Sequence, residues 1–154
     1  MQLGEQSPNI YCWKKFLMTK LEKRLFVTTN IIISIQGIIY FYFKYFMQSE
    51  TPFGARPHGF TSTMLHLHIL LVPFLIIGLG YLLSIHILPK LKLKKSSRRK
   101  SGIALLITLI LSILSGYLLQ MGFELKTSQM IGWLHIGISF IWILLFTWHL
   151  RAKL

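Results

Sequence analysis

The chain has 154 residues, of which 53% are hydrophobic and only 14% are charged. A soluble domain has about 25% charged residues, so this composition excludes an ordinary soluble domain and predicts an integral membrane protein. The formal net charge of +13 is typical of proteins that bind nucleic acid, but the placement of the basic residues argues against that class.

The predicted fold is all-α: an integral membrane, up-and-down four-helix bundle. Residues 1–24 are a basic N-terminal segment, which either lies as a helix in the headgroup region or is a disordered tail. Residues 25–150 are expected to form a single transmembrane domain, because a membrane-spanning helix needs about 20 mostly apolar residues and four such stretches fill this region. The spans are expected at about 25–47, 63–88, 103–123 and 131–150, with a short tail at 151–154.

The basic residues predict how these spans are oriented. Fourteen of the 17 Lys and Arg residues precede the first span, lie between the second and third, or follow the fourth. The positive-inside rule then places both termini and the basic segment at 90–100 in the cytoplasm. Anionic membrane lipid suits the basic segment as a partner better than nucleic acid, which is not expected to bind.

Cysteine and acidic residues limit the chemistry. Cys12 is the only cysteine, so the chain has no intrachain disulfide, no covalent haem attachment and no thiolate-based zinc or iron–sulfur site. The four acidic residues lie outside the predicted spans or at their edges, so paired carboxylates for hydrolysis are missing: Glu5, Glu22, Glu50 and Glu124. No catalytic residue is assigned, and whether the chain is an enzyme stays open.

Four of the six histidines lie at matched depths in the second and fourth predicted spans, which run in the same direction. His68 and His135 lie near the outer starts of these spans, and His86 and His149 lie near their inner ends. Histidines inside a bilayer segment usually mark function, and two imidazoles on facing helices can ligate a haem iron. The pattern predicts two b-type haems, one held by His68 and His135 and one by His86 and His149; a single haem is the smaller alternative.

Helical phase supports this choice of histidines. The 18-residue interval from His68 to His86 is five turns of a regular helix, and the 14-residue interval in the fourth span leaves its two histidines about 40° apart. His66 points about 200° away from His86, so it is only the alternative to His68. The two intervals differ in length, about 27 Å against about 21 Å, and either a different tilt of the two helices or a kink at Pro73 has to absorb the difference.

Less specific roles are open for the same residues. Membrane histidines often join two helices or lie at the interface, and His86 and His149 are close enough to the interface for that. Asn30 and Gln36 are expected to make interhelical polar contacts, and His58 in the outer loop is expected to be solvated. Small residues would leave space for a macrocycle, although they are also ordinary packing surfaces in membranes: Gly78, Gly80, Ser84, Ser112, Ser115, Gly116, Gly137 and Ser139.

Several segments resemble small bacterial four-helix membrane proteins that are similar to the di-haem cytochrome b superfamily. They are residues 65–73 (LHLHILLVP), Ser101 and Gly102, residues 115–119 (SGYLL), and residues 133–135 (WLH) with His149. The resemblance covers roughly residues 25–150, and it implies two b haems ligated by His68, His86, His135 and His149. The second-helix interval is longer than is usual in that family, and no dedicated quinone-site motif is present.

The predicted function is electron relay by a b-type cytochrome across the bacterial inner membrane that the resemblance implies, with a quinone or a redox partner protein as donor or acceptor. Bis-histidine ligation leaves no open iron position, so electron transfer is expected rather than catalysis. The chain could also be a subunit of a larger membrane complex. Two alternatives are a quinone or metal-ion reductase, with a site around Arg56, His58 or His66, and a haem-free membrane anchor or assembly subunit.

Overall fold

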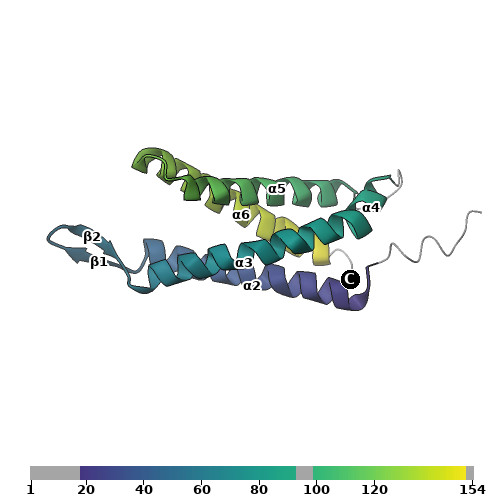
Figure 1. The fold of residues 1–154 in the computed structure, drawn as a ribbon, viewed down its shortest axis with the longest axis horizontal. Coiled ribbons are helices and arrows are strands. Elements are labelled where there is room, and N and C mark those ends of the chain that lie inside the picture. The colour runs from purple at the N-terminus through teal and green to yellow at the C-terminus, as the bar shows by residue number, and fades with distance from the viewer. Residues whose placement is uncertain (1–17, 93–98, 152–154) are drawn as a thin grey trace, which may run out of the picture. The chain divides into compact units, whose positions relative to one another are not determined.

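The computed structural model describes residues 18–92 and 99–151. Four long helices account for most of them: α2 (Lys20–Tyr45), α3 (Phe60–Leu82), α5 (Arg99–Leu118) and α6 (Leu125–Arg151) (Figure 1). The shorter elements are β1 (Gln48–Thr51), β2 (Gly54–Pro57), the π-helical turn η1 (Leu83–Ile87), α4 (Leu88–Lys92) and the 3-10 turn η2 (Leu119–Met121). The predictions for residues 1–17, including Cys12, for the middle of the basic segment at 93–98 and for the tail at 152–154 lie outside the described residues.

Four helical stretches of the described chain are long and apolar enough to span a membrane, as the sequence predicts. They are Lys20–Tyr45, Phe60–Leu91, Arg99–Met121 and Leu125–Arg151, so each predicted span is found and its ends differ by a few residues. Many large apolar side chains on them are exposed, among them Leu70, Phe74 and Ile77. Such a surface is suited to lipid, and with four such helices the chain is a multi-pass membrane protein.

The chain divides into two compact units, Met1–Lys92 and Leu93–Leu154. The first contains the helical hairpin of α2 and α3, and the second contains the hairpin of α5 and α6. Both hairpins are established, whereas the four-helix bundle that would combine them stays a prediction.

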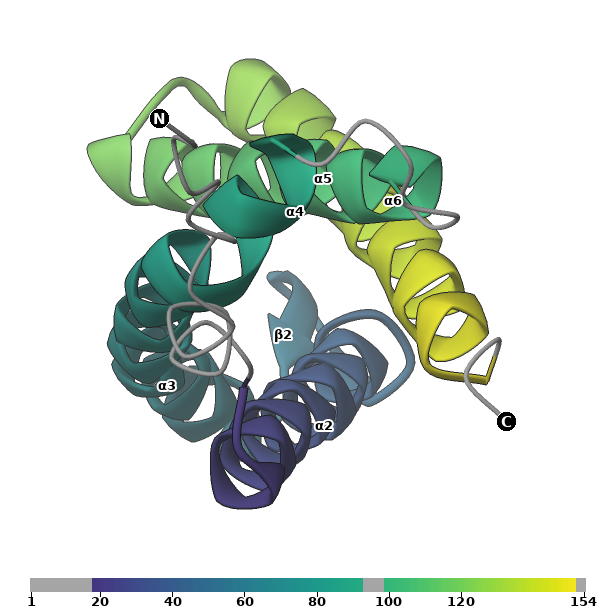
Figure 2. The same ribbon diagram turned by 90° about the vertical axis from the view of Figure 1, so that its right-hand side faces the viewer.

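In the first unit, α2 and α3 lie side by side and run antiparallel (Figures 1 and 2). Gly37 in the second half of α2 faces His68 in the first half of α3, and Gly78 further along α3 faces Phe26 nearer the start of α2. Both glycines allow close approach of the two helices, as small residues commonly do in membrane helix pairs.

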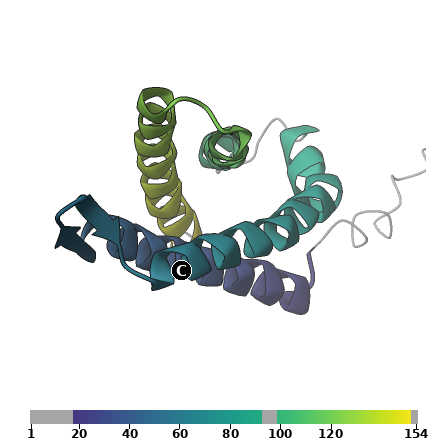
Figure 3. The same cartoon turned by 60° about the vertical axis from the view of Figure 1, so that its left-hand side comes forward.

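A small antiparallel β-hairpin, which the sequence pattern does not predict, joins α2 to α3. Gln48–Thr51 pairs with Gly54–Pro57. Its turn includes Gly54 at a φ of +105°, a conformation that glycine adopts without strain, and the Thr51 hydroxyl donates to the Gly54 carbonyl at 2.6 Å. The hairpin projects beyond the ends of both helices (Figures 1 and 3) and leaves Phe53 fully exposed. Within residues 18–92 and 99–151, this hairpin is the one departure from the all-α expectation.

The C-terminal end of the second span is not a regular helix. α3 continues through Pro73, gives way to the π-helical turn η1, and is followed by α4, which points in a different direction (Figures 2 and 3). A π-helical turn holds about one residue more than an α-helical turn. Because His86 lies within η1, the phase match that a regular helix would give it with His68 does not apply.

In the second unit, α5 and α6 form the other antiparallel hairpin. The turn η2 and Gly122, which has a left-handed φ of +70°, end α5 and lead the chain towards α6. The Ser112 hydroxyl lies 2.7 Å from the Ser139 hydroxyl across the helix pair, so two of the predicted small residues do line a helix–helix contact.

Asn30 of α2 is almost completely buried, with 1% of its surface exposed. Its Nδ2 donates to the Phe26 carbonyl of the same helix at 2.6 Å, so the contact is intrahelical and the expected interhelical contact is wrong. Among the residues that the structure describes, none provides a hydrogen-bond partner for its buried Oδ1. An unsatisfied buried polar atom destabilises a fold by roughly 1–3 kcal/mol.

Asn30→Leu is therefore expected to raise the melting temperature of the detergent-solubilised protein, because leucine has the same branched arrangement of side-chain heavy atoms and no polar atom to satisfy. Thermal unfolding followed by circular dichroism measures the change. Ser34→Ala is the control, since the Ser34 hydroxyl already donates to the Asn30 carbonyl within α2 at 2.7 Å. A lower melting temperature for Asn30→Leu would show that the amide oxygen has a stabilising partner.

Candidate functional site

His68 lies on α3 beside α2, and a glutamine of α2 holds its ring. Nδ1 of His68 is 2.7 Å from Oε1 of Gln36, and Nε2 of Gln36 donates to the Met64 carbonyl, one turn earlier on α3, at 2.5 Å. The interhelical contact expected for Gln36 is thus confirmed. His68 is half-buried whereas its alternative His66 is exposed, which supports the choice of His68.

These contacts determine where the imidazole proton of His68 lies. The Met64 carbonyl can only accept a hydrogen bond, so the NH₂ group of Gln36 faces it and the Gln36 oxygen faces His68. That amide oxygen also only accepts, so Nδ1 of His68 carries a hydrogen and donates it. The lone pair of the neutral ring is then on Nε2, a usual metal-binding atom of a histidine whose Nδ1 is oriented by a second group.

His135 on α6 has the same arrangement with groups of α5. Its Nδ1 lies 3.1 Å from the Ser112 carbonyl and 3.0 Å from the Ser115 hydroxyl. The Ser115 hydroxyl donates to the Leu111 carbonyl at 2.8 Å, so it has a lone pair to offer to the ring. Because a carbonyl oxygen only accepts, Nδ1 of His135 is a donor, and the lone pair of the neutral ring is again on Nε2.

His149 makes a related contact at the other end of the second hairpin. Its Nδ1 lies 2.9 Å from the Ser101 hydroxyl, near the start of α5. A hydroxyl can donate or accept, so this contact orients the ring without selecting one tautomer. Ser101 and Ser115 are 14 residues apart, as are His135 and His149. The contact of Ser115 with His135 and that of Ser101 with His149 therefore form two matched levels along this antiparallel hairpin.

A glycine follows each of these polar side chains on the first helix of the hairpin. A Cβ added at Gly37 would lie 3.2 Å from Cε1 of His68, and a Cβ added at Gly116 would lie 3.2 Å from Cε1 of His135. Carbon atoms at optimal separation are about 3.5–4.0 Å apart. Any side chain at these two positions would therefore push against the imidazole ring.

His86 lies in a different local setting, within the π-helical turn η1. Glu22 precedes Gln36 on α2 by the same 14 residues that separate the two serines of α5, so it marks the matching level of the first hairpin. At this level the Tyr81 hydroxyl donates to the Glu22 carboxylate at 2.5 Å. The first hairpin thus places a phenol and a carboxylate where the second places Ser101 and a histidine.

The loop residues considered for an outer substrate site lie in unlike environments. Arg56 is exposed on β2. His58 is half-buried against two aromatic rings, with centroid distances of 5.1 Å to Phe43 and 5.6 Å to Phe60, so the expectation that it is solvated is wrong. Its Nδ1 accepts the Phe60 N–H at 3.2 Å, which ties the ring to the start of α3.

The described residues do not form a metal site built by protein side chains alone. Within residues 18–92 and 99–151, no three or more His, Cys, Asp or Glu side chains form a cluster that could hold a metal ion. A protein-only zinc site needs three or four such ligands. A bis-histidine haem needs two.

The sequence pattern identified the histidines but not the groups that orient them. Gln36 was assigned only a general polar contact, and the roles of Ser101, Ser115 and the Ser112 carbonyl were not predicted. A signal for these partners is present in the sequence as a polar residue followed by glycine, which occurs once on α2 and twice on α5: Gln36-Gly37, Ser101-Gly102 and Ser115-Gly116.

Comparisons of the chain with protein-family models, with curated proteins and with solved structures find no match. The likeness to di-haem cytochromes therefore stays a prediction from the sequence segments alone.

Proposed function

We propose that the chain is a membrane b-type cytochrome that relays electrons across the bacterial inner membrane through two bis-histidine haems. The observation that carries this proposal is shared by His68 and His135: each lies on the second helix of a hairpin and donates through Nδ1 to an acceptor on the first. Metal-ligating histidines almost always have their second ring nitrogen held in this way. A contact that only joined two helices would not require the adjoining glycine or the same tautomer in both hairpins.

In this proposal His68 and His135 would hold the outer haem, and His86 and His149 would hold the inner one. The outer site is supported by the matched tautomers of its two rings. The inner site is supported by the oriented ring of His149 and by the position of His86 in a π-helical turn, a feature frequent at functional sites. A single haem at the outer site is the smaller alternative.

The donor set fits haem b. The sequence has no Cys-x-x-Cys-His motif, so the group would be bound without covalent attachment. Bound haem supplies a one-electron couple. The chain's residues hold the imidazoles at fixed orientations, raise their basicity through the Nδ1 hydrogen bonds and surround them with apolar helices. With both axial positions filled by histidine, electron transfer is the expected activity.

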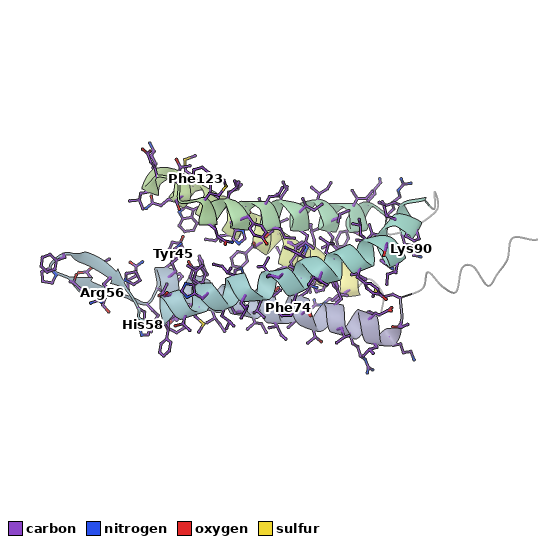
Figure 4. All side chains as sticks on the ribbon, viewed as in Figure 1. Tyr45, Arg56, His58, Phe74, Lys90 and Phe123 are labelled. Carbon is purple, nitrogen blue, oxygen red and sulfur yellow. The ribbon has the colours of Figure 1, made fainter. Side chains whose placement is uncertain are left out.

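Charge supports an orientation with the N-terminus in the cytoplasm. Figure 4 shows Arg56 and His58 at one end of the first unit and Lys90 at the other. Because α2 and α3 are antiparallel, Lys20 and Lys23 lie at the same end as Lys90. That end would contact anionic lipid headgroups. The opposite end would face a quinone or a redox partner protein, and the chain would act alone or within a larger membrane complex.

The test is a reduced-minus-oxidised absorption spectrum of the full chain, purified in mild detergent from haem-supplied cells. The expected result is a pair of sharp α-bands and about two haems per chain. A colourless preparation would overturn the proposal and favour a haem-free membrane anchor or assembly subunit. Turnover with quinol or a ferric chelate by the purified protein would favour a reductase instead.

A further inference from the structure

We infer that Gln36 is the positioning residue of His68: its buried amide holds the imidazole as the Nδ1–H tautomer and so presents Nε2 as the ligand atom. The two hydrogen bonds of this amide carry the inference. Its consequence for a bound iron rests on the proposed function, whereas the tautomer itself does not.

The amide of Gln36 has only one workable orientation. Rotating it by 180° would bring its oxygen to 2.5 Å from the Met64 carbonyl oxygen and its NH₂ group against Nδ1 of His68. Two acceptors would then face each other, and Gln36 is only 5% exposed, so water has little access to relieve them. The fixed amide therefore presents its oxygen to Nδ1 of His68, which has to carry a hydrogen to donate to it.

The second hairpin reaches the same tautomer by a different route. In this hairpin Ser115 precedes the glycine, as Gln36 does in the first hairpin. The group that can only accept a hydrogen bond from His135, however, is the main-chain carbonyl of Ser112. A side-chain substitution can remove the acceptor from His68, whereas no side-chain substitution removes it from His135. The two ligands of the outer site therefore respond differently to equivalent substitutions.

This difference gives Gln36 control over one side of the outer site. An acceptor at Nδ1 makes the imidazole a more basic ligand, and a more basic axial ligand favours the oxidised iron. Gln36→Leu is expected to raise the reduction potential of one haem. The potential of the other haem is expected to stay unchanged in this variant.

The direct test measures the tautomer of His68 without haem. The full chain is labelled with ¹⁵N-histidine, prepared from haem-deficient cells, and studied in detergent by NMR at about pH 9, where a histidine with a pKa of about 6.5 is neutral. Signals of His68 are identified by their loss in His68→Ala. The wild-type ring is expected to carry its hydrogen on Nδ1. In Gln36→Leu the ratio of the Nδ1–H form to the Nε2–H form is expected to fall about tenfold, as the loss of one buried hydrogen bond implies.

Ser115→Ala is the matched control, because the Ser112 carbonyl still accepts from His135 and the tautomer of that ring is expected to persist. An unchanged His68 tautomer in Gln36→Leu, or a wild-type His68 protonated on Nε2, would overturn the inference. If the leucine variant does not fold, the wild-type measurement decides by itself, because Nδ1–H is the form expected there and the Nε2–H form would overturn the inference. A protein that shows the tautomer change but binds no haem would refute the proposed function and leave the role of Gln36 intact.

Discussion

Alanine at His135 is expected to remove about one haem per chain, because bis-histidine ligation fails when either imidazole is lost. The substitution is expected to lower the free energy of unfolding only modestly. The ring makes hydrogen bonds to the Ser112 carbonyl and the Ser115 hydroxyl, each of which contributes about 1 kcal/mol net. The variant should therefore keep its helical content, and the haem-to-protein ratio of the purified chain is the measurement that reports the change.

His66→Ala is the control for this experiment, since His66 lies on α3 two residues from His68 but is exposed. It is expected to keep the full haem content. His149→Ala is expected to remove the inner haem and to leave the outer one. Unchanged haem content in His135→Ala would show that the outer assignment is wrong, and the same result in His149→Ala would show that the inner assignment is wrong.

Alanine at Gly37 or Gly116 is expected to destabilise the protein by about 1–3 kcal/mol, although glycine to alanine inside a helix ordinarily stabilises by about 0.5–1 kcal/mol. The reason is the imidazole that faces each glycine. The added Cβ would lie 3.2 Å from Cε1 of His68 or of His135, so the ring or the helix has to move. Movement of the ring weakens the Nδ1 hydrogen bond, so these variants should also bind less haem.

Gly80→Ala and Gly137→Ala are the matched controls, one in each hairpin, because a Cβ at either position meets no atom within 4 Å. Both are expected to have an unchanged or slightly higher melting temperature. Thermal unfolding in detergent and the haem-to-protein ratio are measured for all four variants. Equal stability of Gly116→Ala and Gly137→Ala would show that the close packing of glycine against histidine is unimportant.

The two hairpins follow a common plan at one level and differ at the other. At the first level, a polar side chain and the following glycine contact a histidine in both hairpins. At the second level, the α5–α6 hairpin joins Ser101 to His149, whereas the α2–α3 hairpin joins Glu22 to Tyr81. The inner site therefore depends on where the π-helical turn places His86, and haem counting in His86→Ala is the way to test that assignment.

The sequence by itself determined the four membrane-spanning helices, because a run of about 20 apolar residues is a local property that needs no knowledge of neighbouring helices. The sequence argument for His68 over His66 depends on helical phase over the five turns to His86, whereas in the structure the contact of His68 with Gln36 and the exposure of His66 support the same choice. Phase failed for His86, because the number of residues in a π-helical turn differs from that of a regular turn and the sequence pattern does not reveal where such a turn occurs.

Only the tertiary structure decided what each histidine contacts. The pairing of Gln36 with His68 and of Ser115 with His135 depends on the register of two antiparallel helices, which the packing of glycines against rings sets across the pair. Apolar periodicity records which residues belong in the membrane but carries no information about that register. Hydrogen bonds act over about 3 Å, so a shift of one helical turn would give each ring a different partner and a different tautomer.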